Sequence, residues 1–141
     1  MKYALSALAI ASVVGLGTSK AEAAGVGDLA GPWQATLLWS NSGCGPASGL
    51  LNFTLNKNGV ASSATLASHT NGCGDSTTTQ VFTIESLDSD GSGTANLTCG
   101  VGCGWNFVIQ VSNNKKIFNL VDVDPANPGN FVEGLAISQS P

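Results

Sequence analysis

Alternation of apolar and polar residues, broken by turn residues, is the feature that most constrains the fold of this chain. In residues 33–39 every second side chain is apolar: Trp33, Ala35, Leu37 and Trp39. Successive side chains of a β-strand point to opposite faces, so this pattern predicts a strand with one buried face. After residue 23, no stretch repeats apolar residues at the spacing of an amphipathic helix. The sequence therefore predicts an all-β domain.

Similar runs recur along the chain, with turn residues between them. Asn58-Gly59 follows the second run, and Asn-Gly is a strong hairpin signal because both residues tolerate positive φ. A loop rich in Gly, Cys, Ser and Thr is expected at residues 67–78. The predicted strands are residues 33–39, 51–55, 60–66, 80–87, 94–99, 105–111, 117–123 and 131–138.

Most connections between these strands are short, which favours pairing of strands that follow each other in the sequence. In such a meander, about eight antiparallel strands can close into a barrel whose interior holds side chains or one small ligand. Closure also removes unpaired strand edges. We therefore predict a small antiparallel barrel, with a two-sheet sandwich of the same strands as the alternative.

The first 23 residues have the three parts of a secretory signal peptide. Lys2 provides a basic start, an apolar run covers residues 4–16, and Ala21-Glu22-Ala23 matches the small-x-small cleavage pattern. We expect cleavage after Ala23 and a single β domain over residues 24–141. A bacterial-type protein that is secreted or periplasmic, with no membrane insertion, is the expected product.

Four cysteines in an exported chain predict two disulfides. Cys99 and Cys103 flank a flexible Gly-Val-Gly segment that can close on itself, which leaves Cys44 for Cys73. Cys44 and Cys73 also share a glycine-rich context. We therefore favour the pairings 44–73 and 99–103 over the other two combinations. A zinc site at Cys99 and Cys103 is the less favoured alternative, because no histidine lies nearby and the compartment is oxidising.

The charge of the chain excludes one large class of partners. Residues 24–141 contain three lysines, eight carboxylates and no arginine, a formal charge of −5. Nucleic-acid binding requires cationic side chains that replace counterions on the phosphates, so no nucleic-acid partner is expected. Anionic membranes would repel the chain for the same reason.

The only histidine, His69, is the best candidate for a catalytic group. With Asp75 and one of Ser63, Ser68 or Ser76 it could form a hydrolase triad, but no Gly-x-Ser-x-Gly turn is present. An exposed loop histidine beside a disulfide is the favoured interpretation. The sequence therefore predicts no catalytic residue, no enzymatic activity and no cofactor.

Acidic residues suggest two further sites, and neither is favoured. Asp88-Ser89-Asp90-Gly91 resembles the start of a calcium-binding loop, and Asp122 and Asp124 could share the ion if their turns meet at one end. A hairpin turn rich in Asp and Gly requires no ion, so no metal site is predicted.

Glu85 and Glu133 could form a glycosidase pair, since two carboxylates at a defined separation satisfy that chemistry. A chain this small leaves little room for a sugar-binding cleft. Both residues are therefore expected to project from strand faces into solvent.

Aromatic residues give the strongest indication of binding. Most are expected to form the core, because rings bury large apolar areas. Some of them could line a pocket or stacking surface for a small apolar ligand. The candidate ligand-binding residues are Trp33, Trp39, Trp105 and Phe107.

Gly31-Pro32-Trp33, at the head of the first predicted strand, resembles the Gly-x-Trp signature of the calycins, which include lipocalins and avidins. In those families the Trp closes one end of an eight-stranded barrel that binds a small apolar or amphipathic molecule. Small secreted bacterial inhibitors of metalloproteases share this architecture. Residues 133–138 also resemble the end of the enediyne-antibiotic apoproteins, which are β-sandwiches with two disulfides that carry a chromophore.

These observations lead to a secreted, non-enzymatic binding protein, with a carrier of a small apolar molecule as the first hypothesis. The alternative is a protein-interaction module, such as a barrel-type protease inhibitor or a surface or matrix component. For an inhibitor, residues 24–30 would be expected to insert into the cleft of the protease.

Overall fold

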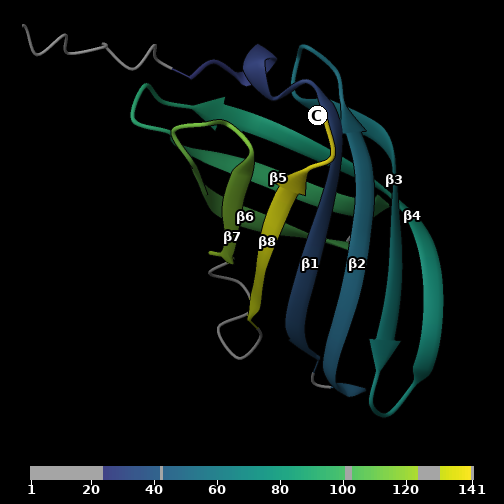
Figure 1. Cartoon of the computed structure of the whole chain (residues 1–141). Helices are drawn as coiled ribbons and strands as arrows, with labels where there is room; N and C mark the ends of the chain where they lie inside the picture. The colour runs from purple at the N-terminus through teal and green to yellow at the C-terminus, as the bar shows by residue number, and fades with distance from the viewer. Residues whose placement is uncertain (1–23, 42, 101–102, 124–130, 141) are drawn as a thin grey trace, which may run out of the picture.

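The structure, a computed structural model, describes residues 24–41, 43–100, 103–123 and 131–140. In this part a short 3₁₀ helix precedes eight antiparallel strands that close into a barrel, with each strand paired to the next in the sequence (Figure 1). The predicted signal peptide lies outside the described residues. The elements are η1 (Val26–Leu29), β1 (Gly31–Asn41), β2 (Gly45–Leu55), β3 (Val60–Thr70), β4 (Gly74–Leu87), β5 (Ser92–Gly100), β6 (Cys103–Val111), β7 (Ile117–Asp122) and β8 (Val132–Ser138).

Pairing of β1 with β8 closes the barrel. The two strands pair over seven residues, from Trp33 with Ser138 to Trp39 with Val132. The predicted meander barrel is therefore confirmed. The two-sheet alternative, and with it the likeness to the sandwich-type apoproteins, is wrong because the first and last strands belong to one continuous sheet.

The interior face next to this closure alternates small and large residues. Leu37 on β1 lies in register with Gly49 on β2 and with Gly134 on β8. A Cβ on Gly134 would overlap the Leu37 side chain and the Thr36 carbonyl. The missing side chain thus allows β8 to approach β1 closely, and Leu37 occupies the space that remains.

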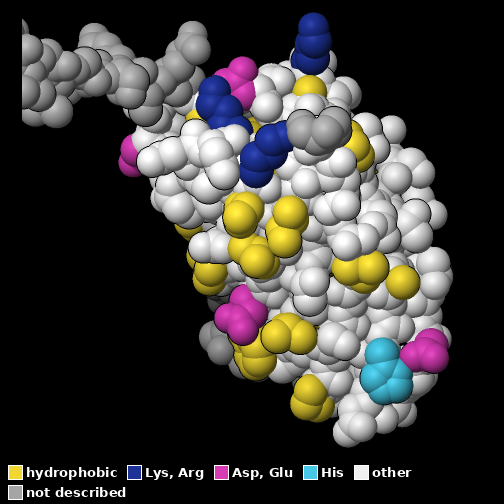
Figure 2. All heavy atoms as spheres, in the orientation of Figure 1, with side chains coloured by type: hydrophobic (Ala, Val, Ile, Leu, Met, Phe, Trp, Pro, Cys, Tyr) yellow, Lys and Arg dark blue, Asp and Glu magenta, His cyan; other side chains and the backbone are white. Residues whose placement is uncertain are grey.

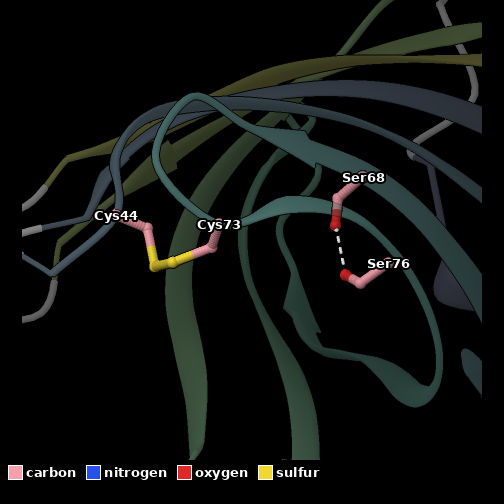
Figure 3. The surroundings of a disulfide bond; sticks show 4 residues. All are labelled: Cys44, Ser68, Cys73 and Ser76. Atoms are coloured by element: carbon pink, nitrogen blue, oxygen red, sulfur yellow. Dashed lines mark hydrogen bonds between the residues drawn. A yellow bond between two sulfur atoms is a disulfide. The ribbon is translucent and has the colours of Figure 1, made fainter.

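The predicted loop over residues 67–78 is wrong, because β3 continues to Thr70 and β4 starts at Gly74. The two strands form a hairpin, which extends past the shorter strands of the barrel (Figure 1). Its side chains are polar and largely exposed on both faces, so they show no apolar alternation. Two features stabilise the hairpin as strands. Thr favours strands because of its branched Cβ. Ser68 and Ser76 face each other across the two strands and are joined by a 2.8 Å hydrogen bond between their Oγ atoms (Figure 3).

An up-and-down meander places alternate turns at opposite ends of the barrel. The β2–β3, β4–β5 and β6–β7 turns lie at the end where η1 precedes β1, which we call the η1 end. The β1–β2, β3–β4 and β5–β6 turns lie at the other end. This disulfide end contains Cys44 and Cys73.

The disulfide between Cys44 and Cys73 confirms the long-range pairing (Figure 3). The two Cα atoms are 5.4 Å apart and lie in the turns of neighbouring hairpins. The second predicted pairing involves Cys103, whose side chain lies outside the described residues, and it stays a prediction.

The barrel interior is filled by apolar side chains that include Phe53, Phe82 and Phe118, all 5% exposed or less. Their rings form a cluster with Trp33, with centroid distances of 4.8 Å for Trp33 to Phe118 and 4.7 Å for Phe53 to Phe82. Phe82 and Phe118 are stacked with centroids 6.2 Å apart.

Among the described residues, η1 is far too short to cross a membrane, and no other helix is present that could do so.

Replacement of Phe118 by Ala tests the role of this ring cluster. We expect Phe118→Ala to lower the free energy of unfolding by about 3–5 kcal/mol, because it leaves a cavity against Trp33, Phe53 and Phe82. Phe131→Ala is the matched control, since Phe131 is 57% exposed, and it should change the value by less than about 0.5 kcal/mol. Urea denaturation followed by circular dichroism measures both, and equal losses would contradict the assignment.

Removal of the Cys44–Cys73 bridge tests how much the long hairpins depend on it. The bridge spans 29 residues of sequence. In the chain-entropy model such a loop stabilises the fold by about 3–4 kcal/mol, which the double variant Cys44→Ala/Cys73→Ala should lose. Urea denaturation at constant pH measures the loss, and an unchanged midpoint would show that the bridge does not stabilise the barrel.

Candidate functional site

The four aromatic residues predicted to bind a ligand lie at inward-facing positions of the barrel. Trp33, Trp39 and Phe107 are 3%, 8% and 1% exposed, and Trp105 is partly buried against the same core. The rings of Trp39 and Trp105 contact each other with centroids 5.5 Å apart. A Cβ on Gly49 would approach the Trp39 ring to 3.0 Å. A ligand at these residues would therefore have to displace a packed ring.

His69 lies on strand β3 and not in the predicted loop, and its side chain points outward. Its Nδ1 is 2.7 Å from Oδ1 of Asp75, which faces it across the β3–β4 ladder. Both side chains are exposed, at 65% and 87% (Figure 2, cyan and the adjacent magenta). Ser68 and Ser76 are the sequence neighbours of this pair, and they point to the opposite face of the sheet. Neither serine can therefore act as the nucleophile for His69.

Ser48 is the hydroxyl that the structure places beside this histidine, and the sequence analysis did not consider it. On β2 it lies in register with His69 on β3, so serine, histidine and Asp75 follow one another across three strands. β2 pairs on both sides at Ser48, with Leu38 of β1 and with His69. The ladders therefore use the strand's N–H groups, and none is left to stabilise an oxyanion.

The candidate calcium ligands are not brought together. Asp88 and Asp90 lie in the β4–β5 turn at the η1 end, whereas Asp122, the last residue of β7, pairs with Phe107 in the middle of β6. Asp90 Oδ1 accepts hydrogen bonds from the backbone N–H and the hydroxyl of Ser92, and these bonds lower the pKa of its carboxyl group. The Asp90 carboxylate thus stabilises the β4–β5 turn in which it lies. Asp124 lies outside the described residues.

The carboxylates considered as a glycosidase pair are also separated. Glu85 is near the end of β4 and Glu133 is near the start of β8, and both point outward. Four strand positions separate β4 from β8 in either direction around the closed sheet. The two groups therefore cannot flank one glycosidic bond.

The N-terminal segment is packed against the η1 end of the barrel. Leu29 is 1% exposed, and its carbonyl accepts a 2.8 Å hydrogen bond from Nε1 of Trp33. Asp28 accepts a 2.7 Å hydrogen bond from Nζ of Lys115, which together with the Gly25 N–H holds the pKa of the Asp28 carboxyl below its ordinary value. A segment held in this way differs from the free arm that insertion into a protease cleft requires.

The outer surface of β1, β6, β7 and β8, together with the residues that flank β7 and β8, carries a group of exposed apolar side chains. Each is between 38% and 57% exposed. Register places Val108 opposite Val121 and Ile117 opposite Ile137 on adjacent strands. Hydrophobic side chains gather over β8 and its neighbours in Figure 2. We call this group the outer apolar face; it consists of Leu38, Val108, Ile117, Val121, Val123, Phe131, Leu135 and Ile137.

The outer surface of β2 to β5 is mainly polar, and its exposed large apolar side chains in the described part are Leu50 on β2 and Val81 on β4. Thr65 on β3 faces Thr79 on β4, and Thr83 on β4 faces Asn96 on β5. Asn96 also donates a 2.8 Å hydrogen bond to Asn106 on β6. The apolar side chains are therefore concentrated on one side and are not a general property of this surface.

A groove of about 400 Å³ crosses the outer apolar face along β8. Leu38, Val121 and Leu135 contribute apolar walls, and Thr36 and Asn119 contribute polar ones. The carboxylate of Glu133 belongs to the same lining, in register with Leu38 on one side and with Val121 on the other. The groove therefore offers apolar contact and one negative charge to a molecule that binds there.

The sequence analysis did not single out this face, although one signal was present. Val108 lies between Phe107 and Ile109, so the apolar residues there are continuous and cannot all point inward. The same holds for Val121 beside Leu120. Such runs indicate strands with apolar residues on both faces.

Comparison with known proteins gives no relative from which a function could be carried over: no family model, curated protein or solved structure matches the chain.

Tryptophan fluorescence tests for a ligand inside the barrel. Because Trp39 and Trp105 contact each other and pack against the core, we expect a long-chain fatty acid to leave the emission maximum unchanged. The titration is repeated with Trp105→Phe, which removes the more accessible ring of the pair. A shift that saturates at one equivalent and disappears in Trp105→Phe would instead establish an interior site.

Proposed function

We propose that this protein is a secreted, non-enzymatic protein-interaction module that binds its partner through the outer apolar face. The observation that carries this proposal is the clustering of eight large apolar side chains, 38–57% exposed, on one side of the barrel. Contiguous apolar patches of more than a few hundred Å² are uncommon on monomers and mark sites of interaction.

The packing of the interior favours this module over the carrier of a small apolar molecule. Inward positions of the described strands hold closely packed side chains, among them the stacked Phe82 and Phe118. Exposed apolar area, in contrast, is available on the outside without any rearrangement. Burying it against a partner provides the free energy of association, at roughly 25 cal/mol per Å² before the costs of binding.

A calycin-like relationship and an exported location belong to the same proposal. The eight-stranded meander barrel is the architecture of the calycins, and Trp33 of the Gly31-Pro32-Trp33 motif is buried at the η1 end, beneath Leu29. The Cys44–Cys73 disulfide is compatible with an extracellular or periplasmic protein, because such bonds persist in oxidising compartments. Of the interaction modules considered, a surface or matrix component fits better than an inhibitor, because η1 is packed on the barrel.

Site-specific photo-crosslinking tests the proposed face. A benzophenone amino acid replaces Leu135, on the outer apolar face, or Thr79, which is also outward on β4 but faces Thr65 of β3. In the cells that produce the protein, we expect an adduct of defined mass from position 135 and none from position 79. Mass spectrometry identifies the adduct.

A second variant establishes that the adduct depends on apolar contact. Leu38→Ser/Val121→Ser removes two walls of the groove without altering the core, because both side chains are about half exposed. The yield from position 135 should then fall by about tenfold, as expected when residues at the centre of an interface are lost. Equal adducts from positions 135 and 79, or no adduct from either, would overturn the proposal.

A further inference from the structure

Glu133 is a charged residue that lies between members of the outer apolar face, and its neighbours on the adjacent strands are aliphatic. Register places Leu38 of β1 and Val121 of β7 directly beside it. Leu135 follows two residues later on the same face of β8. Directly opposed side chains of neighbouring strands lie about 5 Å apart, so the carboxylate has an apolar neighbour on each side.

No cation of the described chain lies near this carboxylate. Lys57, Lys115 and Lys116 all lie in turns at the η1 end (dark blue at the top of Figure 2). The closest approach along β8 is at Ser138, whose N–H donates to the Lys116 carbonyl. Ser138 is five residues from Glu133, which corresponds to about 17 Å along a strand.

The ammonium groups of two of these lysines have partners at that same end. Lys115 Nζ donates to Asp28 and Lys116 Nζ donates to the carbonyl of Ser140. The sequence contains no arginine. Among the residues that the structure describes, no lysine pairs with Glu133, so a partner could supply the positive charge.

Resting on the proposed function, we infer that the partner presents a lysine or arginine flanked by aliphatic residues, whose side chain lies in the groove and pairs with Glu133. Both residues have an aliphatic stem and a charged tip, so the stem contacts Leu38, Val121 and Leu135 while the tip reaches the carboxylate. The groove is open and, at about 400 Å³, is large enough for one such side chain.

The alternative occupants match this chemistry less well. An acidic segment is repelled by Glu133 and by the excess of carboxylates over lysines. A wholly apolar segment would cover Glu133 without pairing it, which costs free energy of desolvation. The described lysines of a second copy lie at the η1 end, and the two nearest this face are already paired within their own chain, Lys115 with Asp28 and Lys116 with the Ser140 carbonyl.

Titration with n-pentylammonium tests the inference, because this ion has the four methylenes and the ammonium group of a lysine side chain, with a methyl group in place of Cα. Amide chemical shifts of the ¹⁵N-labelled chain locate the binding, with 1-pentanol as the uncharged probe of equal length. We expect n-pentylammonium to shift the amides of Leu38, Val121, Glu133 and Leu135. Its affinity should fall roughly 2- to 5-fold in Glu133→Gln, the effect of a surface ion pair, whereas 1-pentanol should bind both forms equally.

Glu85→Gln is the matched control. Glu85 is also an exposed strand glutamate, but it lies on β4 away from the groove, so its loss should leave the affinity for n-pentylammonium unchanged. Unaltered amide spectra elsewhere show that each variant is folded. Equal affinity of n-pentylammonium for wild type and Glu133→Gln, or no shifts at the groove, would overturn the inference.

Two further results separate this inference from the proposed function. An adduct at position 135 with an unchanged yield in Glu133→Gln would overturn the basic partner and leave the interaction face standing. Absence of any adduct from position 135 when Glu133 is unchanged would overturn the proposed function itself.

Sedimentation tests whether a second copy is the occupant. We expect a monomer, and a dimer abolished by Leu135→Ser would overturn the inference by identifying a second copy as the occupant.

Discussion

The pairing of β1 with β8 is the contact on which the rest of the structure depends. It joins the first and last strands over seven residue pairs and converts an open meander into a closed sheet. Gly134 makes the approach possible, because a side chain there would overlap Leu37 and the backbone of Thr36. Closure removes both sheet edges and separates an inside from an outside, and the ring cluster of the core can then be excluded from water.

Closure of an up-and-down sheet also determines which loops meet. The turns that contain Cys44 and Cys73 lie at the same end, where one disulfide joins them. The same topology separates Asp90 from Asp122 and Glu85 from Glu133, so the catalytic and metal-binding combinations considered for these carboxylates do not form.

The division of side chains between the two faces of the wall gives the barrel its proposed role. Inward positions are filled by rings and small residues, and outward positions of β2 to β5 are mainly hydroxyl and amide groups. Apolar side chains on β1 and β6 to β8 are the exception. Their exposure is unfavourable in water, and a partner that covers them and supplies a cation for Glu133 would remove that cost.

The sequence by itself determined most of the strands, since alternation and turn residues such as Asn58-Gly59 act over a few neighbours. It also indicated the long disulfide, because Cys99 and Cys103 lie close enough to pair locally and leave Cys44 for Cys73. The strand prediction failed at residues 67–78, because both faces of the β3–β4 hairpin are largely exposed to solvent there and no apolar alternation marks the strands. Only the tertiary structure decided between barrel and sandwich, and only it brought Leu38, Val121 and Glu133 together. These residues are distant in sequence, and their contact depends on strand order and register, which local patterns do not encode.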